Sequence, residues 1–338
     1  MRKTSFFRIQ LPKNNIFLTL TTKDTHTKLL IIGTTPSSAG IGGVTVHVER
    51  FLQHLDKEQF PYDIFDYKKE PFMKVFGKIK QAKAAHLHIC NPYYMFILAL
   101  ACVFYRKKFF LTLHGKYIQG VQKPWMLIQY AVKNAFVPIV LNKESLDACR
   151  IINPRTTLIP AFIPPQTDEK LELEITDLVK SLHAKGKLVA VTYGYDEVYD
   201  VSGNEIYGID FLISFFNENK EYDLIISNPT GNYKKKYTDL KENIHLIDHP
   251  HSLFELMKIT DIFIRNTSKD GDSLSVKEAL FLKKRVLCTD VVERPGGVQL
   301  FKYSDKKSFE ACLKQNEPSN MPDVESGEVK IIELYNSL

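Results

Sequence analysis

The sequence lacks the features of disulfide-stabilised, zinc-binding and membrane-spanning proteins. Its five cysteines are widely separated and none belongs to a Cys-x-x-Cys pair, so neither a disulfide framework nor a zinc site is indicated. The longest apolar run, residues 92–105, is shorter than the roughly 20 residues of a spanning helix, and we interpret it as a buried helix. The first 28 residues show no apolar signal-peptide core. We expect a cytoplasmic protein, either free or attached to the inner face of the membrane.

The length of 338 residues and an ordinary globular composition, 44% apolar and 25% charged, predict two domains. Short β-branched runs alternate with helical segments on both sides of a proline-rich stretch, and runs that are apolar throughout indicate strands buried on both faces. We therefore predict an α/β fold of two Rossmann-like, doubly wound parallel sheets, with ligands bound in the cleft between them. The predicted units are 1–165, with 1–27 as an extension of uncertain structure, 166–322, and a terminal helix in 323–338 that could pack back on the first unit.

Charge is unevenly distributed between these units. Residues 1–165 hold 23 lysines and arginines against 9 acidic residues, whereas residues 166–338 hold 22 against 30. A basic domain beside an acidic one indicates that the first meets an anionic partner, such as a membrane surface, nucleic acid or a phosphorylated substrate. Aromatic residues do not alternate with the basic ones and no nucleic-acid-binding motif is present. We expect no nucleic-acid partner.

The densest basic segment, residues 68–83, is predicted to form an amphipathic helix. Phe72, Val75, Phe76 and Ile79 fall on one of its faces. Its cations could bind anionic lipid, each contributing on the order of 1 kcal/mol, or the helix could simply cover the core of its own domain. Both interpretations stay open. The lysines that would face a membrane are Lys68, Lys69, Lys74, Lys78 and Lys80.

Two features of the first domain follow predicted strands. A loop rich in glycine and serine, with Gly42 and Gly43 before a helix, would let a ligand approach the backbone and offer N–H groups to an anion. Its spacing matches no nucleotide-binding fingerprint, and a purely structural turn explains it equally well. His114, in the segment TLHG, could donate to a hydroxyl or to developing charge, although a structural histidine is the simpler interpretation. The sequence assigns no role to His47, His86 and His88.

The most informative segment, RNTSKDGDSLSVKEAL, follows a predicted strand at 261–264. It separates Asp270 from Glu278 by seven residues, with a turn and a helix start between them. Phosphate could sit on the backbone N–H groups near Ser273 and Ser275 while the two carboxylates accept hydrogen bonds from sugar hydroxyls. Simpler interpretations stay open: Asp272 as an N-cap, Ser275 with Glu278 as a capping box, and Asp-Gly-Asp as a metal motif.

At these residues the sequence resembles the GT-B glycosyltransferases of the large retaining family 4, which includes many bacterial capsule, exopolysaccharide and lipopolysaccharide enzymes. The glycine loop, TLHG and the acidic segment occur in the family's order, and Asp270-x7-Glu278 stands in the place of its Glu-x7-Glu motif. The resemblance covers roughly residues 28–338. It implies retaining transfer of a sugar from a nucleotide-sugar donor to a saccharide or lipid-linked saccharide acceptor in cell-surface polysaccharide synthesis, with no cofactor or metal.

The resemblance also implies roles for individual residues. Glu278 would bind the ribose hydroxyls of the donor, Asp270 would contact the donor sugar, and His114 would lie near the transferred sugar. The backbone at Gly42 and Gly43 would approach the phosphates. The remaining donor-site residues would be Arg265, Asp272, Ser273, Leu274 and Ser275.

One departure from the family pattern concerns the diphosphate. The family has an Arg and a Lys early in its donor domain, whereas residues 193–210 contain neither. Arg265, Lys269 and Arg294 are the nearest alternatives, and Arg265 is preferred because it ends the strand before the acidic loop. The missing pair keeps open a catalytically inactive GT-B-like scaffold of a polysaccharide-assembly complex. A GT-B epimerase or phosphorylase is a third hypothesis.

Overall fold

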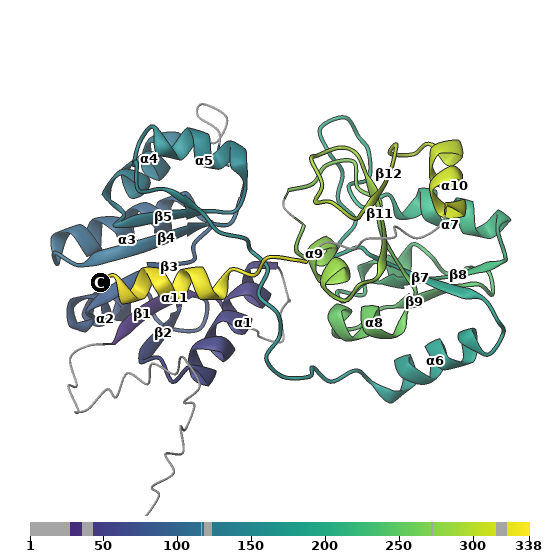
Figure 1. The fold of residues 1–338 in the computed structure, drawn as a ribbon, viewed down its shortest axis with the longest axis horizontal. Helices are drawn as coiled ribbons and strands as arrows, with labels where there is room; N and C mark the ends of the chain where they lie inside the picture. The colour runs from purple at the N-terminus through teal and green to yellow at the C-terminus, as the bar shows by residue number, and fades with distance from the viewer. Residues whose placement is uncertain (1–27, 36–42, 116, 118–123, 272, 316–322) are drawn as a thin grey trace, which may run out of the picture.

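The computed structural model describes residues 28–35, 43–115, 117, 124–271, 273–315 and 323–338. They form two α/β units that lie side by side, each built on a six-stranded sheet whose paired strands are all parallel (Figure 1). This arrangement confirms the predicted α/β fold with two doubly wound parallel sheets. Gly42 and Asp272, two of the predicted donor-site residues, lie outside the described residues.

The first sheet has the strand order β2-β1-β3-β4-β5-β6. Its strands are β1 (Leu29–Gly33), β2 (Tyr62–Asp66), β3 (Ala84–Leu87), β4 (Lys108–Leu113), β5 (Val137–Val140) and β6 (Thr157–Leu158). Its helices are α1 (Gly43–Lys57), α2 (Lys74–Gln81), α3 (Pro92–Phe104), α4 (Trp125–Asn134) and α5 (Lys143–Arg150). Residues of α2, α3, α4 and α5 form the core on one face of this sheet, whereas α1 and the C-terminal helix α11 (Glu328–Asn336) cover the other face.

The second sheet has the order β12-β11-β10-β7-β8-β9. Its strands are β7 (Leu188–Tyr193), β8 (Tyr222–Ser227), β9 (Ile244–Ile247), β10 (Ile262–Arg265), β11 (Arg285–Thr289) and β12 (Gln299–Phe301). Its helices are α6 (Leu173–His183), α7 (Ile209–Glu218), η1 (Asn232–Lys235), α8 (Leu253–Ile259), α9 (Leu274–Phe281) and α10 (Lys306–Lys314). Helices α7 and α10 pack on one face of this sheet, and α6, α8 and α9 pack on the other.

The order of the strands determines where a ligand can bind. In each sheet the direction of winding reverses at one point, between β1 and β3 in the first sheet and between β7 and β10 in the second. Open parallel sheets bind ligands in the crevice outside the carboxyl ends of their strands at such a point. The loops that follow β1, β7 and β10 are therefore the natural place for the site.

Helix α11 joins the end of the chain to the first unit. Its Ile331 and Tyr335 are buried in the same apolar cluster as Phe51 of α1, and the Gly327 N–H donates to the carbonyl oxygen of Phe162 at 2.9 Å. A Cβ on Gly327 would lie 2.3 Å from the Pro160 carbonyl oxygen, so the chain can cross here only at a glycine. Segments more than 150 residues apart thus hold the first unit together.

Some local predictions are wrong. The basic helix, predicted over 68–83, covers only 74–81. The run 92–105, predicted to be a buried helix, forms α3 with one face exposed, because one side of the helix has no element packed on it among the residues that the structure describes. No helix within the described ranges has both the length and the apolar character needed to cross a bilayer.

Candidate active site in the cleft between the domains

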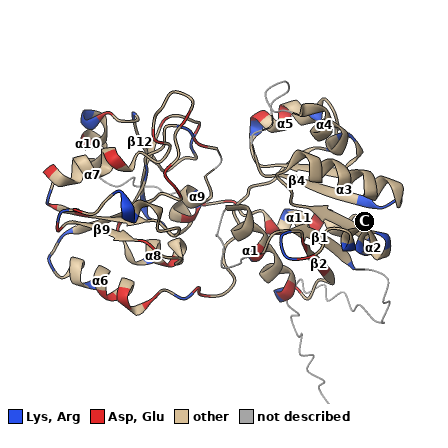
Figure 2. Ribbon diagram, turned by 180° about the vertical axis from the view of Figure 1, so that it is seen from behind, with Lys and Arg blue, Asp and Glu red and all other residues tan. Residues whose placement is uncertain are grey.

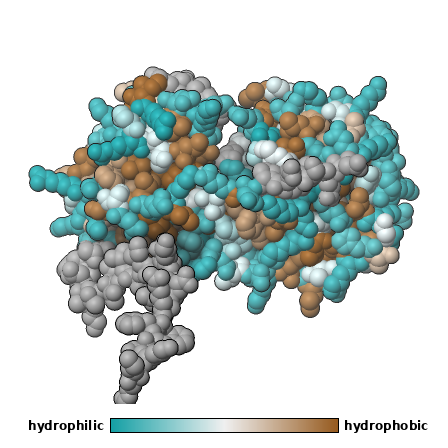
Figure 3. Space-filling model, in the orientation of Figure 1, coloured by the Kyte–Doolittle hydropathy of each residue, from teal (hydrophilic) through white to brown (hydrophobic). Residues whose placement is uncertain are grey.

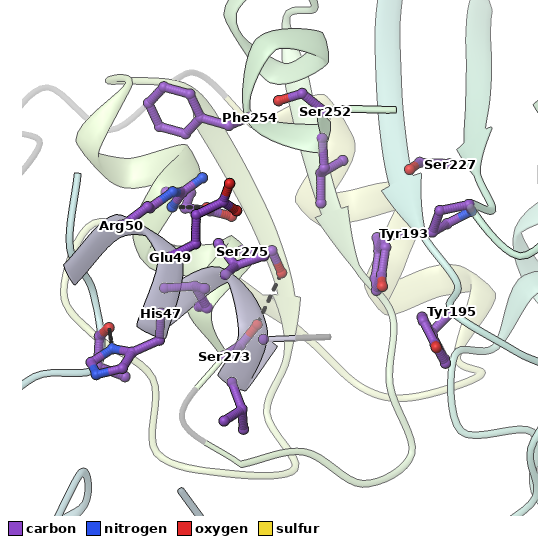
Figure 4. A pocket seen from close by; sticks show the side chains of 18 of the residues that line it. His47, Glu49, Arg50, Tyr193, Tyr195, Ser227, Ser252, Phe254, Ser273 and Ser275 are labelled. Carbon is purple, nitrogen blue, oxygen red and sulfur yellow. Dashed lines mark hydrogen bonds and ion pairs between the residues drawn. The ribbon is translucent and has the colours of Figure 1, made fainter. Parts of the chain in front are cut away.

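A cleft of about 750 Å³ lies between the two units, at the carboxyl ends of strands from both sheets. It is lined by residues at or just after the ends of β4, β7, β8 and β10, and by the N-terminal parts of α1 and α9. Figure 4 shows His47, Glu49 and Arg50 of α1 near Ser273 and Ser275, with tyrosines on the opposite wall. Every predicted site residue that the structure describes lines this cleft: Gly43, His114, Arg265, Asp270, Ser273, Leu274, Ser275 and Glu278.

Two helices begin at the cleft. Gly43 is the first residue of α1, and Ser273 directly precedes Leu274, the first residue of α9. The N-terminus of a helix carries a partial positive charge and backbone N–H groups, so two such ends in one cleft favour an anion. The Ser273 side chain makes no capping bond, and its hydroxyl lies 3.1 Å from that of Ser275. Glu278 is bonded to an arginine of α1, so the structure shows no reciprocal capping box here.

Glu278 is a buried carboxylate held by a cation from the other domain. Its Oε1 accepts a hydrogen bond from Nη1 of Arg50, and the Arg50 Nη2 lies 3.4 Å from Glu169 Oε1. The Arg50 guanidinium also stands over the Phe254 ring, 5.2 Å from its centroid. Burial raises the pKa of Glu278 and the negative charge of Glu169 raises it further, whereas Arg50 lowers it. One arginine thus serves two carboxylates at the floor of the cleft.

At Asp270 the ratio is reversed, because two arginines bind one carboxylate. Arg265 donates from Nε to Oδ2 at 3.0 Å and from Nη2 to Oδ1 at 2.9 Å, and Arg294 donates from Nη1 to Oδ2 at 2.7 Å. Burial alone would raise the pKa of Asp270, but the two guanidiniums outweigh burial and hold this pKa at about 2. The cluster has one cation in excess, and its Arg265 and Asp270 line the cleft.

His114, which is half-buried, lies beside the two buried histidines His47 and His88. Its Nε2 lies 3.0 Å from Nδ1 of His88, and the Nδ1 of His47 lies 2.7 Å from the carbonyl oxygen of Ala161. Burial lowers the pKa of His114 and of His88 well below the ordinary value, and lowers that of His47 to about 4, so all three are neutral near pH 7. Neutral imidazoles can donate a hydrogen bond without placing a charge beside a sugar. Their nitrogens lie within 4.8 Å of one another, close enough to share a metal ion after a small movement.

Tyrosines form the wall that residues 193–210 contribute to the cleft. Tyr193 ends β7, and Tyr195 and Tyr207 lie in the loop that follows. The Arg265 guanidinium stands 5.5 Å from the centroid of the Tyr207 ring, which helps to fix its orientation. Among the described residues that line the cleft, the arginines are Arg50 and Arg265.

Several residues that line the cleft were not predicted from the sequence. Glu49 and Arg50 lie on α1 about two turns after Gly43. A charged residue on the buried face of a helix is a signal that could have found Arg50. Phe254 and Ser252 come from α8 and its N-cap, where nothing in the sequence distinguishes them from ordinary core and capping residues. Further lining residues of this kind include His47, Tyr193, Tyr195, Tyr207, Ser227 and His251.

Two α/β units with parallel sheets that face a shared cleft define the GT-B fold, and comparison with solved structures agrees. HepE from Anabaena, solved with UDP-glucose, is 14% identical, with a TM-score of 0.64 over 92% of this chain and 100% of that chain. The catalytic domain of starch synthase IV from Arabidopsis thaliana, solved with ADP and acarbose, is 11% identical, with a TM-score of 0.61 over 92% of this chain and 99% of that one.

A Listeria monocytogenes protein described as a candidate UDP-N-acetylglucosamine 2-epimerase also matches, at 12% identity and a TM-score of 0.61 over 92% of this chain and 96% of that one. No protein-family model matches the chain, and no curated protein does. At these identities the comparisons establish the GT-B fold and leave the reaction to be argued from the cleft.

Proposed function

We propose that the protein is a glycosyltransferase that binds a nucleotide-sugar donor in this cleft. The observation that supports the proposal best is the convergence of Glu278, two helix N-termini and a cationic Arg–Asp cluster where the sheets reverse their winding. Each group suits a different part of a nucleotide sugar. The similar structures solved with UDP, UDP-glucose and ADP show that such ligands occur on this fold.

In the reaction, an acceptor hydroxyl oxygen forms a bond to the anomeric carbon while that carbon's bond to the diphosphate oxygen breaks. The nucleoside diphosphate leaves with the bonding electrons and takes up the acceptor's proton. Glu278 accepts hydrogen bonds from the ribose hydroxyls, and the ends of α1 and α9 bind the diphosphate. The excess cation of the Arg265, Arg294 and Asp270 cluster balances the charge that develops on the leaving group.

Asp270 acts in this proposal by fixing both arginines, since their guanidiniums hold both of its oxygens. The neutral His114 donates a hydrogen bond to the transferred sugar. Protein groups supply the positive charge, so we expect turnover to persist in EDTA. Retention at the anomeric carbon and a role in cell-surface polysaccharide synthesis are parts of the proposal that rest on the sequence resemblance. A lipid-linked acceptor rests also on the basic charge of the first domain, and a cytoplasmic location rests on the scattered cysteines and the lack of an apolar signal-peptide core.

Donor binding is tested by thermal shift with UDP, GDP, ADP, CMP and their common sugars. A ligand that binds only the native state stabilises it by RT ln(1 + [L]/Kd), about 2.7 kcal/mol at a hundredfold excess over Kd. We expect one nucleotide class to stabilise the wild type and Glu278→Gln to lose that response. Glu49→Gln, a second carboxylate variant in the same cleft, is the matched control and should keep it.

A wild type that responds to no nucleotide would contradict the proposal. A wild type that binds one but neither releases nucleoside diphosphate nor transfers sugar would favour the scaffold hypothesis. One structural observation favours the scaffold hypothesis: Arg50 donates a hydrogen bond to the Glu278 carboxylate, which the ribose hydroxyls would need as their acceptor. Product formed without any acceptor would favour an epimerase.

A further inference from the structure

The outward face of α3 is an apolar stripe with no element packed on it among the described residues. The helix contains no charged residue, and its inner side is buried in the core of the first unit. The residues of the stripe, with their exposed fractions, are Tyr93 (60%), Ile97 (37%), Leu100 (46%) and Phe104 (76%). Spacings of four, three and four residues place them on one line of a helix, about 16 Å long.

Neighbouring segments widen this stripe. The Phe72 ring stacks on Tyr94 at 5.1 Å, which places the exposed Met73 next to the start of α3. On the other side the Phe96 ring contacts Tyr130 of α4 at 5.0 Å, and α4 exposes 80% of Met126. Figure 3, in the orientation of Figure 1, presents the side of this domain where α11 lies, whereas α3 faces the viewer in Figure 2. Soluble proteins rarely leave an apolar patch of this kind uncovered unless it binds something.

The charged residues of the stretch that contains this stripe have a single sign. Between residues 71 and 143, the stretch that contains α2, α3 and α4, every charged residue is a lysine or an arginine. Lys74 and Lys80 are exposed on α2, and Arg106 and Lys107 follow α3 directly. In Figure 2, α3 is tan along its length while α2 carries blue. An apolar face formed by a stretch whose own charges are all positive is complementary to a surface that is apolar in its interior and negatively charged at its edge.

The acidic groups that approach this face are already paired. Asp63 of β2 and Glu70 before α2 lie 3.6 and 3.5 Å from Lys78 Nζ, which also donates to the carbonyl oxygen of Ile64. Lys69 likewise lies 3.7 Å from Asp66. Two of the five lysines assigned to membrane contact from the sequence are therefore engaged within the protein, and the candidate surface moves from α2 to the stripe of α3.

We propose that this surface docks on an anionic phospholipid bilayer, with α3 lying in the plane of the interface. Tyr93, Leu100 and Phe104 enter the boundary between headgroups and acyl chains, and the flanking lysines and arginines meet lipid phosphates. A second copy of the chain fits less well, because a twofold contact through this face would bring cations against cations. The inference deepens the proposed function: a docked protein could take a lipid-linked acceptor from the same bilayer.

The test is flotation of the full chain with vesicles of phosphatidylcholine, with and without phosphatidylglycerol. We expect binding that needs the anionic lipid and weakens with added salt. The variant Leu100→Glu/Phe104→Glu should bind at least about tenfold more weakly. The matched control Leu173→Glu/Val201→Glu changes two exposed apolar residues of the other domain, 79% and 106% exposed, and should bind as the wild type does. The variant Lys74→Glu/Lys80→Glu should lose the preference for anionic lipid.

Fluorescence distinguishes insertion from simple charge attraction. The chain has one tryptophan, Trp125, so Leu100→Trp in a Trp125→Phe background places a single reporter in the stripe. Its emission should shift to the blue with anionic vesicles, whereas Leu173→Trp in the same background should not respond. Stability and nucleotide response are measured on each variant, so that loss of lipid binding with an unchanged nucleotide response separates this inference from the proposed function.

Three results would overturn the inference. The first is a wild type that ignores anionic vesicles, and the second is equal binding by the wild type and the stripe variant. The third is a wild type that sedimentation shows to be a dimer, converted to a monomer by Leu100→Glu/Phe104→Glu, which would make the stripe an interface between copies of the chain.

Discussion

Asp270 and Glu278 lie on one loop-and-helix segment, separated by seven residues, yet their surroundings are electrically opposite. Asp270 shares two arginines from its own domain, so its cluster has an excess of positive charge. Glu278 shares one arginine, from the other domain, with Glu169 of the connecting segment, so its cluster has an excess of negative charge. The first cluster lies within the second domain, whereas the second cluster exists only while the two domains meet.

This difference indicates that Asp270 has a structural role, whereas Glu278 can exchange its partner for a ligand. The two guanidiniums that bind Asp270 belong to its own domain and occupy both of its oxygens. We therefore expect these contacts to persist when a ligand binds. A carboxylate that borrows its cation across a domain boundary can exchange that partner for ribose hydroxyls. We therefore expect the Asp270 cluster to govern the stability of the second domain, and the Glu278 cluster to govern how the domains and the donor come together.

The largest effect is expected from Asp270→Asn. It leaves Arg265 and Arg294 buried without their carboxylate, and breaking a buried pair in this way costs about 3 to 5 kcal/mol of unfolding free energy. Urea unfolding followed by circular dichroism measures this loss. Asp323→Asn, at an ion pair on the protein surface, is the control and should change stability by less than about 0.5 kcal/mol. A loss below about 1 kcal/mol for Asp270→Asn would show that the cluster is not the support described here.

Arg50→Met comes next, with an expected loss of about 2 to 3 kcal/mol. The methionine keeps an apolar stem, and the loss is limited because a buried Glu278 can take up a proton once its cation is gone. Unfolding of the two single variants and of Arg50→Met/Glu278→Gln gives a coupling energy. Additive losses in that cycle would argue against a direct interaction between the domains at this pair.

The two carboxylates should also give stability opposite dependences on pH. The pKa of Asp270 lies at about 2, below its ordinary 3.8, so its contribution of about 2 kcal/mol is present above pH 4 and lost as pH falls toward 2. The pKa of Glu278 is raised above 4.5, so stability is greatest below that pH and declines as pH rises through the folded-state value. Unfolding of the wild type, Asp270→Asn and Glu278→Gln is compared from about pH 2 to about pH 7. Parallel curves for all three would refute the contrast.

The smallest change is expected from Glu169→Gln. Glu169 raises the pKa of Glu278 by like-charge repulsion, so removing its charge should bring that pKa closer to 4.5. The side chain is about one-third exposed, and the stability should therefore change by less than about 1 kcal/mol. The Glu278 carboxyl resonance in an NMR titration reports the shift. A pKa that stays in place would mean that burial and Arg50 set it without Glu169.

Much of the fold could be predicted because it depends on local pattern. Uniformly apolar runs between helical segments indicate parallel strands buried on both faces, and the structure has them. The short strands 157–158 and 299–301 were not predicted, because two or three residues are too few to show an apolar run. The spacing of Asp270 and Glu278, and the place of His114 after a strand, could likewise be read from the chain.

The sequence by itself therefore determined the number and type of layers. It also determined which segments place polar residues at the ends of strands. Only the tertiary structure decided their partners, because Arg50 and Glu278 are 228 residues apart and no local pattern links them. The same holds for α3. A helix that is apolar on every side has no periodicity to show which face is covered, so only the packing of the sheet behind it left one face exposed.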